Sequence, residues 1–276
     1  WIERALGLRR LNAFYERALD RTSEATFPAR ILAEMGVGTQ TSAEDFERIP
    51  TEGSLLVVAN HPFGAMEGLA LLELIRRRRS DVKIMANYIL GRIPELRDDF
   101  FFVDPFGRRS SVSRNINTLR QALNWLRDGK VLIVFPAGEV ASFAPHAFRV
   151  RDPAWQPSLM ALARRANVKR FLPVYIPGTA SLLFHLVGKI HPRLRTILLP
   201  REMLRLRRRT LTLRVGSPLS GETLFRRFPE DVDALRYLRF RTFLLAGRVD
   251  ASRFERQMRR LTLDDTTREN VPVIPP

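Results

Sequence analysis

The sequence predicts an α/β fold in which a largely parallel central sheet is flanked by helices, with a small helical element at the N-terminus. From residue 54 onward, short apolar runs alternate with segments of helical periodicity. The apolar runs are almost continuously hydrophobic, as strands buried on both faces of a parallel sheet are. The chain has 276 residues, 45% of them hydrophobic and 27% charged, which suits one large globular domain with a small addition.

Residues 1–48 are expected to form the helical element, ahead of an α/β domain over 49–276. Its first helix is predicted from apolar residues at helical spacing with arginines between them, namely Leu8, Leu11, Tyr15 and Leu19. A second, shorter helix is expected to end at Gly36. A basic amphipathic pair of this kind suits contact with a membrane surface, and it suits equally well a cap on the core of the larger domain.

Strands and helices are then expected to alternate. The strands are apolar runs bounded by turn residues, at 54–59, 82–86, 100–103, 131–135, 171–176 and 211–215. The helical patterns cover 67–78, 111–128, 157–167 and 231–247. In sheets of this type, sites form beyond the carboxyl ends of the strands. The residues that follow each strand are therefore the candidates for function.

The first strand leads directly into residues that could carry acid–base chemistry. Asn60 and His61 follow it, Pro62 and Gly64 shape a turn, and Glu67 falls near the start of the next helix. An imidazole in this place can take a proton from a hydroxyl, and a carboxylate can fix its tautomer and stabilise the imidazolium. The ordinary alternative is a histidine on a surface turn and a glutamate favoured by the helix dipole.

Two later strands end in similar candidate loops. After the strand at 131–135 come Pro136, Gly138 and Glu139, on a turn whose backbone N–H groups could face an anionic head group or a developing oxyanion. The alternative there is an ordinary strand-to-loop turn. The strand at 171–176 carries an internal proline, and the strand at 100–103 is followed by Arg108 and Arg109.

These segments resemble, in the same order, the four signature blocks of the glycerolipid acyltransferases, the lysophosphatidic acid acyltransferase superfamily. The first block pairs a histidine with an acid, usually an aspartate, with four residues between them. Here five residues separate His61 from Glu67. This variant resembles a bacterial branch of lysophospholipid acyltransferase-like proteins, some labelled hemolysin-like and some linked to ornithine lipid synthesis.

Two of the blocks depart from the usual pattern of the superfamily. In the second block, Pro105 stands where most members have an arginine that grips the phosphate of the acceptor. Arg108 and Arg109 come just afterwards and are the expected substitutes, which weakens the case for a glycerol-phosphate acceptor. In the third block the acid has moved past the glycine, to Glu139. The resemblance implies substrate-binding roles for Asn60, Gly64, Arg108, Arg109, Pro136, Gly138 and Glu139.

The resemblance also implies the reaction and its partners. His61 would be the general base and Glu67 its orienting acid, in transfer of a fatty acyl chain to the hydroxyl of a lyso-lipid. The acyl donor would be acyl-CoA or acyl carrier protein, with no separate cofactor and no metal. The partners are the donor, the lyso-lipid acceptor and an anionic membrane surface, at the cytoplasmic face of the inner membrane, where the protein would be peripheral.

Charge and composition limit the other possibilities. The 46 Lys and Arg residues against 29 Asp and Glu leave a net charge of +17, which attracts anionic lipid or nucleic acid, or simply keeps the protein soluble. The absence of cysteine excludes disulfides, thiolate metal sites and cysteine nucleophiles. No apolar run approaches the roughly 20 residues that span a bilayer.

Three alternative functions stay open. A nucleic-acid-binding protein would explain the charge, but the sequence lacks zinc-finger spacing, an RNA-binding aromatic motif and a basic zipper, so no nucleic-acid partner is expected. A thioesterase could use His61 to activate water. An inactive, lipid-binding scaffold would account for the altered second and third blocks.

Overall fold

The computed structural model describes residues 6–20, 22, 24–104, 109–144, 149–190 and 192–248. By its internal contacts the chain divides into a first compact unit, Trp1–Leu245, and a second, Ala246–Pro276. The first unit holds the sheet and the helices of the α/β fold together with the helices that precede it.

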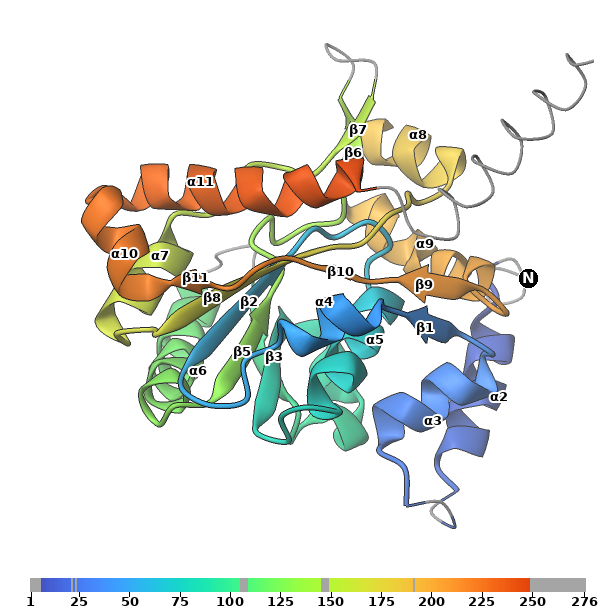
Figure 1. Ribbon diagram of the computed structural model, residues 1–276. Coiled ribbons are helices and arrows are strands. Elements are labelled where there is room, and N and C mark those ends of the chain that lie inside the picture. Colours follow the sequence, from blue (N-terminus) through green and yellow to red (C-terminus); the bar gives the residue numbers. More distant parts are fainter. Residues whose placement is uncertain are drawn as a thin grey trace, which may run out of the picture. The chain divides into compact units, whose positions relative to one another are not determined.

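Within the described residues the central sheet has seven strands in the order β10-β8-β2-β5-β3-β4, with β11 also paired to β8 (Figure 1). The five parallel strands are β2 (Leu55–Ala59), β3 (Val82–Asn87), β4 (Phe100–Val103), β5 (Val131–Val134) and β8 (Arg170–Tyr175). The short strands β10 (Arg214–Val215) and β11 (Leu219–Ser220) are antiparallel to β8. The predicted α/β class with a largely parallel sheet is confirmed.

Strand β2 shows why these sequences form buried strands. All five of its residues are inaccessible, and successive side chains enter two different cores. Leu55 and Val57 belong to the core on one face, whereas Leu56 and Val58 belong to the core on the other. A strand covered on both faces needs apolar residues at every position, which is the continuous pattern that the sequence has.

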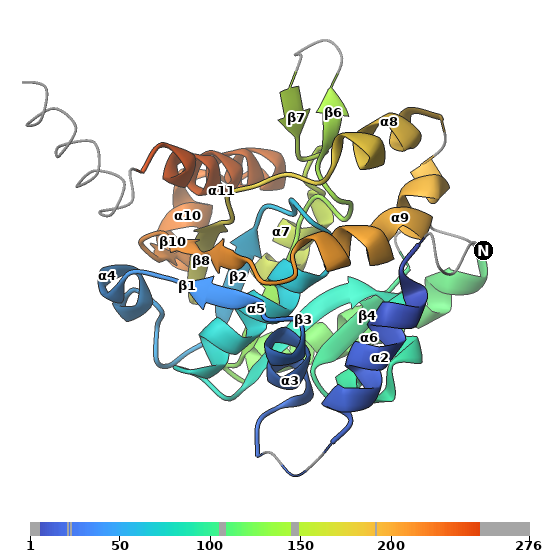
Figure 2. The ribbon, with the colours of Figure 1, turned by 90° about the vertical axis from the view of Figure 1, so that its right-hand side faces the viewer.

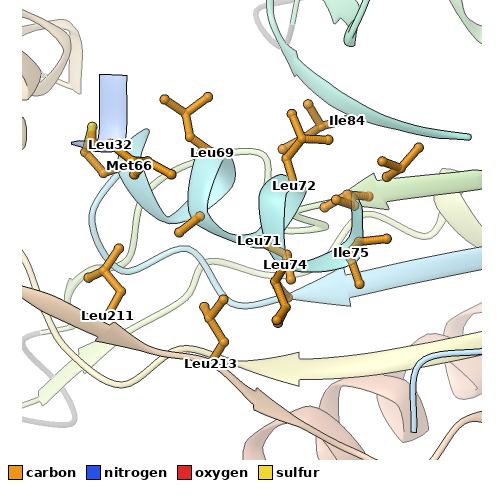
Figure 3. Close-up of a cluster of buried hydrophobic side chains, with 14 of the residues drawn as sticks. Leu32, Met66, Leu69, Leu71, Leu72, Leu74, Ile75, Ile84, Leu211 and Leu213 are labelled. Carbon is orange, nitrogen blue, oxygen red and sulfur yellow. The ribbon is translucent and has the colours of Figure 1, made fainter. Parts of the chain in front are cut away.

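Helices contribute buried side chains to both cores. The first core is built on α5 (Met66–Arg76), whose side chains Leu69, Leu72 and Ile75 lie among those of neighbouring elements in Figure 3. The helices whose buried residues line the second core are α6 (Arg109–Arg127), α7 (Ser158–Arg165), α10 (Gly221–Arg227) and α11 (Asp231–Leu244). The helices predicted at 67–78, 111–128, 157–167 and 231–247 are thus present.

The N-terminal element contains the two expected helices, α2 (Leu8–Ala18) and α3 (Phe27–Glu34), followed by β1 (Gly38–Gln40) and α4 (Ala43–Glu47). The predicted apolar stripe is wrong at its last member, because Leu19 is 36% exposed. The inward face consists of residues at helical spacing that are buried or packed against the core, Leu11, Phe14, Tyr15 and Ala18. Helix α2 contacts α3, and α3 contacts α5 (Figure 2). A domain boundary at residue 48 stays a prediction.

The strand expected at 211–215 is two strands in different sheets. β9 (Thr210–Thr212) pairs in parallel with β1, whereas β10 pairs with β8. Leu213 still donates its N–H to the carbonyl of Gln40, and the next residue, Arg214, is already opposite Tyr175. The chain therefore passes from one sheet to the other within this apolar run.

Several elements were not expected from the sequence. The largest are the helices α8 (Leu182–Ile190) and α9 (Pro192–Arg205), of which α9 contains Pro200. Others are the strands β1, β11, β6 (Ser142–Ala144) and β7 (Arg149–Arg151), the helices α4 and α10, and the 3-10 helices η1 (Tyr88–Arg92) and η2 (Pro94–Leu96). The 3-10 helix η4 (Leu245–Gly247) falls at the end of the pattern predicted at 231–247. Across the helices that the structure describes, none combines the length and the apolarity that crossing a bilayer requires.

Candidate active site

The candidate site lies beyond the carboxyl end of β2. Because β2 is hydrogen-bonded to β5 on one side and to β8 on the other, the loops that follow these three strands meet at one edge of the sheet. The carboxyl end of β4 is further away, because β5 and β3 separate β4 from β2. Neighbouring strands are about 4.8 Å apart, so β4 and β2 are about 14 Å apart.

His61 is fixed by contacts from three parts of the chain. Its ring stacks on that of Phe135, the first residue after β5, with centroids 4.3 Å apart and planes at 26°. Its carbonyl accepts a hydrogen bond of 2.9 Å from the N–H of Ala141, and its own N–H donates to Oδ1 of Asp152 at 3.3 Å. The side chain is 15% exposed, so the imidazole is shielded but can still be reached.

Glu67 connects the imidazole to the turn that carries it. Its side chain is fully buried, and its Oε1 lies 3.1 Å from Nδ1 of His61. The same oxygen accepts hydrogen bonds of 2.7 Å from the N–H groups of Phe63 and Gly64, and Oε2 accepts one of 3.1 Å from Ala65. The residue before α5 provides no side-chain cap, so Glu67 caps this end of the helix from within its first turn.

The electrostatics of this pair suit a general base. Burial alone raises the pKa of Glu67, but the side chain of His61 and the N–H groups of Gly64 and Phe63 outweigh it and bring that pKa below its ordinary value. Glu67 is therefore ionised at neutral pH. Nδ1 of His61 is shielded from solvent and faces this charge, although the two atoms are not aligned as in a hydrogen bond. A carboxylate there favours the tautomer with the proton on Nδ1 and leaves Nε2 as the acceptor.

The conformation of the turn depends on Gly64. Its φ angle is +106°, in the region that favours glycine. A Cβ atom at this position would lie 2.5 Å from Cδ2 of Leu199 in α9 and 3.0 Å from Cγ2 of Val140. The resemblance to the acyltransferases implied that Gly64 binds substrate, which stays a prediction. In the structure, the missing side chain of Gly64 allows α9 and the loop after β5 to approach the catalytic turn.

Asn60 joins the loop after β2 to the loop after β8. The amide is 5% exposed, its Nδ2 donates to the carbonyl of Ile176 at 2.9 Å, and its Oδ1 accepts from the N–H of Ile176 at 2.7 Å. The side chain of Asn60 therefore satisfies both the N–H and the C=O of Ile176. Asn60 thus fixes the first and fourth signature segments side by side.

The third signature segment forms the turn next to Phe135. The carbonyl of Pro136 accepts from the N–H of Gln156 at 3.0 Å, and the N–H of Gly138 donates to the carbonyl of Phe135 at 2.9 Å. Gly138 has a φ of +68°. Glu139 is half-exposed and forms an ion pair of 2.7 Å with Arg195 of α9. Substrate binding by Pro136, Gly138 and Glu139 stays a prediction.

The two arginines of the second segment lie at a gap in the described structure. Arg108 lies outside the described residues. Arg109 is the first residue of α6, the helix that follows β4 in the chain. Their predicted role in holding the acceptor is therefore untested.

Asp152 is a site residue that the sequence analysis missed. It follows β7 and is 6% exposed. Oδ1 accepts from the backbone N–H of His61 and Oδ2 from Nε1 of Trp155, both at 3.3 Å, and the backbone carbonyl accepts from Arg239. Burial raises the pKa of Asp152 above its ordinary value, and these hydrogen bonds oppose the shift only in part. The sequence around it gives no local signal of a contact 91 positions away.

Similarity to known proteins identifies the family of the chain. Residues 11–252 match a protein family described as acyltransferase. The lyso-glycine lipid O-acyltransferase of Phocaeicola vulgatus is 24% identical over 184 residues, which are 64% of this chain and 63% of that protein. The protein of the same name from Bacteroides thetaiotaomicron is 24% identical over 191 residues, 67% of each chain.

A solved structure is also similar. It is that of the 1-acyl-sn-glycerophosphate acyltransferase PlsC from Thermotoga maritima, with a TM-score of 0.45 at 18% identity, over 90% of this chain and 95% of that one. The match to the family extends over most of the sequence and includes the turn of His61, the loops after β5 and β8, and helices α8 and α9. The chain therefore belongs to the acyltransferase family.

Proposed function

We propose that this protein is an O-acyltransferase that moves a fatty acyl chain from an acyl thioester to the hydroxyl of a lyso-lipid at a membrane surface. The observation that carries the proposal is the placement of His61 against the buried, ionised Glu67 at the end of β2. Membership of the acyltransferase family supports transfer of an acyl group as the reaction that this pair performs.

The proposed reaction uses the pair for two proton transfers. Nε2 of His61 takes the proton of the acceptor hydroxyl while the hydroxyl oxygen attacks the thioester carbonyl. The tetrahedral intermediate then collapses, the carbon–sulfur bond breaks, and the thiolate takes the proton from the imidazolium. Glu67 stabilises the imidazolium between these steps. A positioned base of this kind contributes about 10²–10⁴ in rate, and the orientation of the two substrates contributes more.

The acceptor is proposed to be a lyso-lipid with an amino-acid head group. Both named relatives are lyso-glycine lipid O-acyltransferases. This chain also has Pro105 where the wider superfamily has its phosphate-binding arginine. The donor is acyl-CoA or acyl carrier protein, both of which are anionic and suit a protein with a net charge of +17.

The test is acyl transfer from labelled acyl-CoA and labelled acyl carrier protein to a panel that contains lyso-glycine lipid, lyso-ornithine lipid and lysophosphatidic acid. Wild type is compared with His61→Ala. The matched control is His185→Gln, because His185 is also a buried histidine, and it contacts Thr179 rather than Glu67. A labelled diacylated product that is lost with His61→Ala and kept with His185→Gln supports the proposal.

Other outcomes would assign another function. Release of free fatty acid at the same rate with and without acceptor would make the protein a thioesterase. A folded wild-type protein that yields no product with any pair of substrates would overturn the proposal in favour of the lipid-binding scaffold.

A further inference from the structure

Helix α8 is apolar on the side that packs on the protein and also on the side that does not. Phe184 and His185 are buried, at 1% and 6% exposure, whereas Leu182, Leu183 and Leu186 are 72%, 38% and 50% exposed. A helix that is hydrophobic all round is normally buried in a large core or in a membrane. Figures 1 and 2 both show α8 at the edge of the molecule, next to α9 and the β6–β7 hairpin.

The exposed leucines form one continuous face. At about 100° per residue, Leu182, Leu183 and Leu186 fall within an arc of about 100°, and Phe184 and His185 lie on the other side of the helix. We call these three residues the α8 leucine face. We propose that the α8 leucine face inserts into the interfacial region of an anionic lipid bilayer and so brings the catalytic turn to the membrane surface.

Charge favours an anionic bilayer as the occupant. From Leu182 to Arg205 the only acidic residue in the sequence is Glu202, which is 3% exposed. The arginines that are exposed at the end of α9 and just after it are Arg201, Arg205, Arg207, Arg208 and Arg209. A segment with an apolar helical face, several exposed arginines and no exposed acid of its own is the pattern of a helix that lies in the interface of an anionic membrane.

The same helices are fastened to the catalytic turn. Ser181, just before α8, donates its N–H and its hydroxyl to the two carboxylate oxygens of Glu202 in α9, at 2.7 and 2.5 Å. In α9, Leu199 contacts Gly64 of the His61 turn, and Arg195 pairs with Glu139 of the loop after β5. A bilayer that receives the α8 leucine face is therefore mechanically connected to the residues that position His61.

The N-terminal helices are a weaker candidate for this role. From the sequence, α2 and α3 suited membrane contact and a cap on the core equally well, and their apolar residues Phe14, Phe27 and Leu32 are buried in the core of the protein. Their inward packing makes the α8 leucine face the better candidate, because its three leucines are exposed. The inference rests on the proposed function in one respect. The proposed function supplies a lipid acceptor, and the α8 leucine face explains how that acceptor reaches His61.

The test is co-sedimentation of the full chain with vesicles made of phosphatidylglycerol and phosphatidylcholine in equal parts, and with vesicles of phosphatidylcholine alone. The variant is Leu182→Gln/Leu186→Gln. Its control is Phe240→Gln/Leu244→Gln, because these α11 residues have the same spacing and are 56% and 53% exposed, but α11 also carries Asp231 and Asp233. The α8 variant is expected to lose about tenfold in binding to the anionic vesicles, and the control to bind as wild type does.

Activity measurements separate this inference from the proposed function. With a water-soluble, short-chain acceptor, the α8 variant should transfer acyl groups as fast as wild type, and with acceptor embedded in vesicles it should lose about tenfold. The protein could bind vesicles through α8 and yet have no transferase activity. This result would contradict the proposed function and still support the inference about α8.

Three results would overturn the inference itself. The first is equal vesicle binding by wild type and the α8 variant. The second is a wild-type dimer that the α8 substitutions convert to a monomer, which would make the face an interface between copies. The third is an α8 variant that binds vesicles normally but has lost binding to acyl carrier protein.

Discussion

Oε1 of Glu67 lies 3.1 Å from Nδ1 of His61 and accepts hydrogen bonds from two N–H groups of the turn between these residues. One oxygen atom therefore orients the catalytic ring and also holds the backbone that presents it. The five-residue spacing between the histidine and the acid is what allows this arrangement, because the turn passes close enough for Phe63 and Gly64 to reach the carboxylate. The predictions below begin with this residue.

Glu67→Gln should reduce kcat about 100-fold, because the neutral amide no longer stabilises the imidazolium or fixes its tautomer. The free energy of unfolding should fall by about 1–3 kcal/mol. The side chain of glutamine has an NH2 donor where glutamate has a second acceptor oxygen, so it cannot accept all the N–H groups that Glu67 binds. The control is Glu73→Gln on the same helix, where the side chain contacts Thr26 and Arg76. Steady-state kinetics with wild-type rates for Glu67→Gln would remove Glu67 from the mechanism.

The stability that Glu67 contributes should depend on pH. Its pKa is lowered from 4.5 by folding, so the folded state binds fewer protons than the unfolded state as the group titrates. The contribution is fully present above about pH 4.5 and is lost as the pH falls through the lowered value. Urea unfolding of wild type and Glu67→Gln should therefore give a difference in free energy that shrinks in acid. A difference that is constant or grows below pH 4.5 would contradict the assignment.

Gly64→Ala should displace the turn. The added methyl group meets Leu199 and Val140, and the positive φ is strained for alanine, so we expect a loss of about 2–4 kcal/mol and a clear fall in kcat. Gly129→Ala isolates the strain, because Gly129 has a φ of +81° and an added Cβ meets no atom within 4 Å. It should cost about 1 kcal/mol and leave activity unchanged. Equal losses of unfolding free energy for Gly64→Ala and Gly129→Ala would show that the close approach of α9 to Gly64 does not matter for stability.

Asn60→Ala should destabilise the protein and separate two of the loops at the site. It leaves the buried N–H and C=O of Ile176 without their partner, at about 1–3 kcal/mol for each group. The exposed Asn124 of α6 provides the control, and Asn124→Ala should be close to neutral. Thermal and urea unfolding give the comparison. A neutral Asn60→Ala would mean that Ile176 finds another partner at no cost.

Much of the fold could be predicted because the signals are local. The five parallel strands are continuous apolar runs between turns, and helices such as α6 and α7 have apolar residues at helical spacing. The run at 211–215 was misread because its pattern is the same whether it pairs with one strand or two. Only the positions of β1 and β8 decide that Thr212 and Arg214 belong to different sheets.

The site could be predicted only in part for the same reason. His61 and Glu67 are six positions apart, so a turn and a helix start are enough to bring them together. The contact of His61 with Asp152 and the ion pair of Glu139 with Arg195 join distant segments and leave no trace in the local sequence. Helices α8 and α9 were missed because the prolines at 192 and 200 resemble breaks in helical structure.

The double duty of Glu67 constrains how this sequence can evolve. A lineage that no longer needs the reaction loses less backbone structure by replacing His61, because that ring stacks on Phe135 and faces Glu67, whereas the N–H groups of the turn are bound by Glu67. Replacing Glu67 first would cost the turn three of its hydrogen bonds. Descendants that have lost catalysis but kept the fold should therefore have changed the histidine and retained the acid, and an intact glutamate alone is no evidence of an active enzyme.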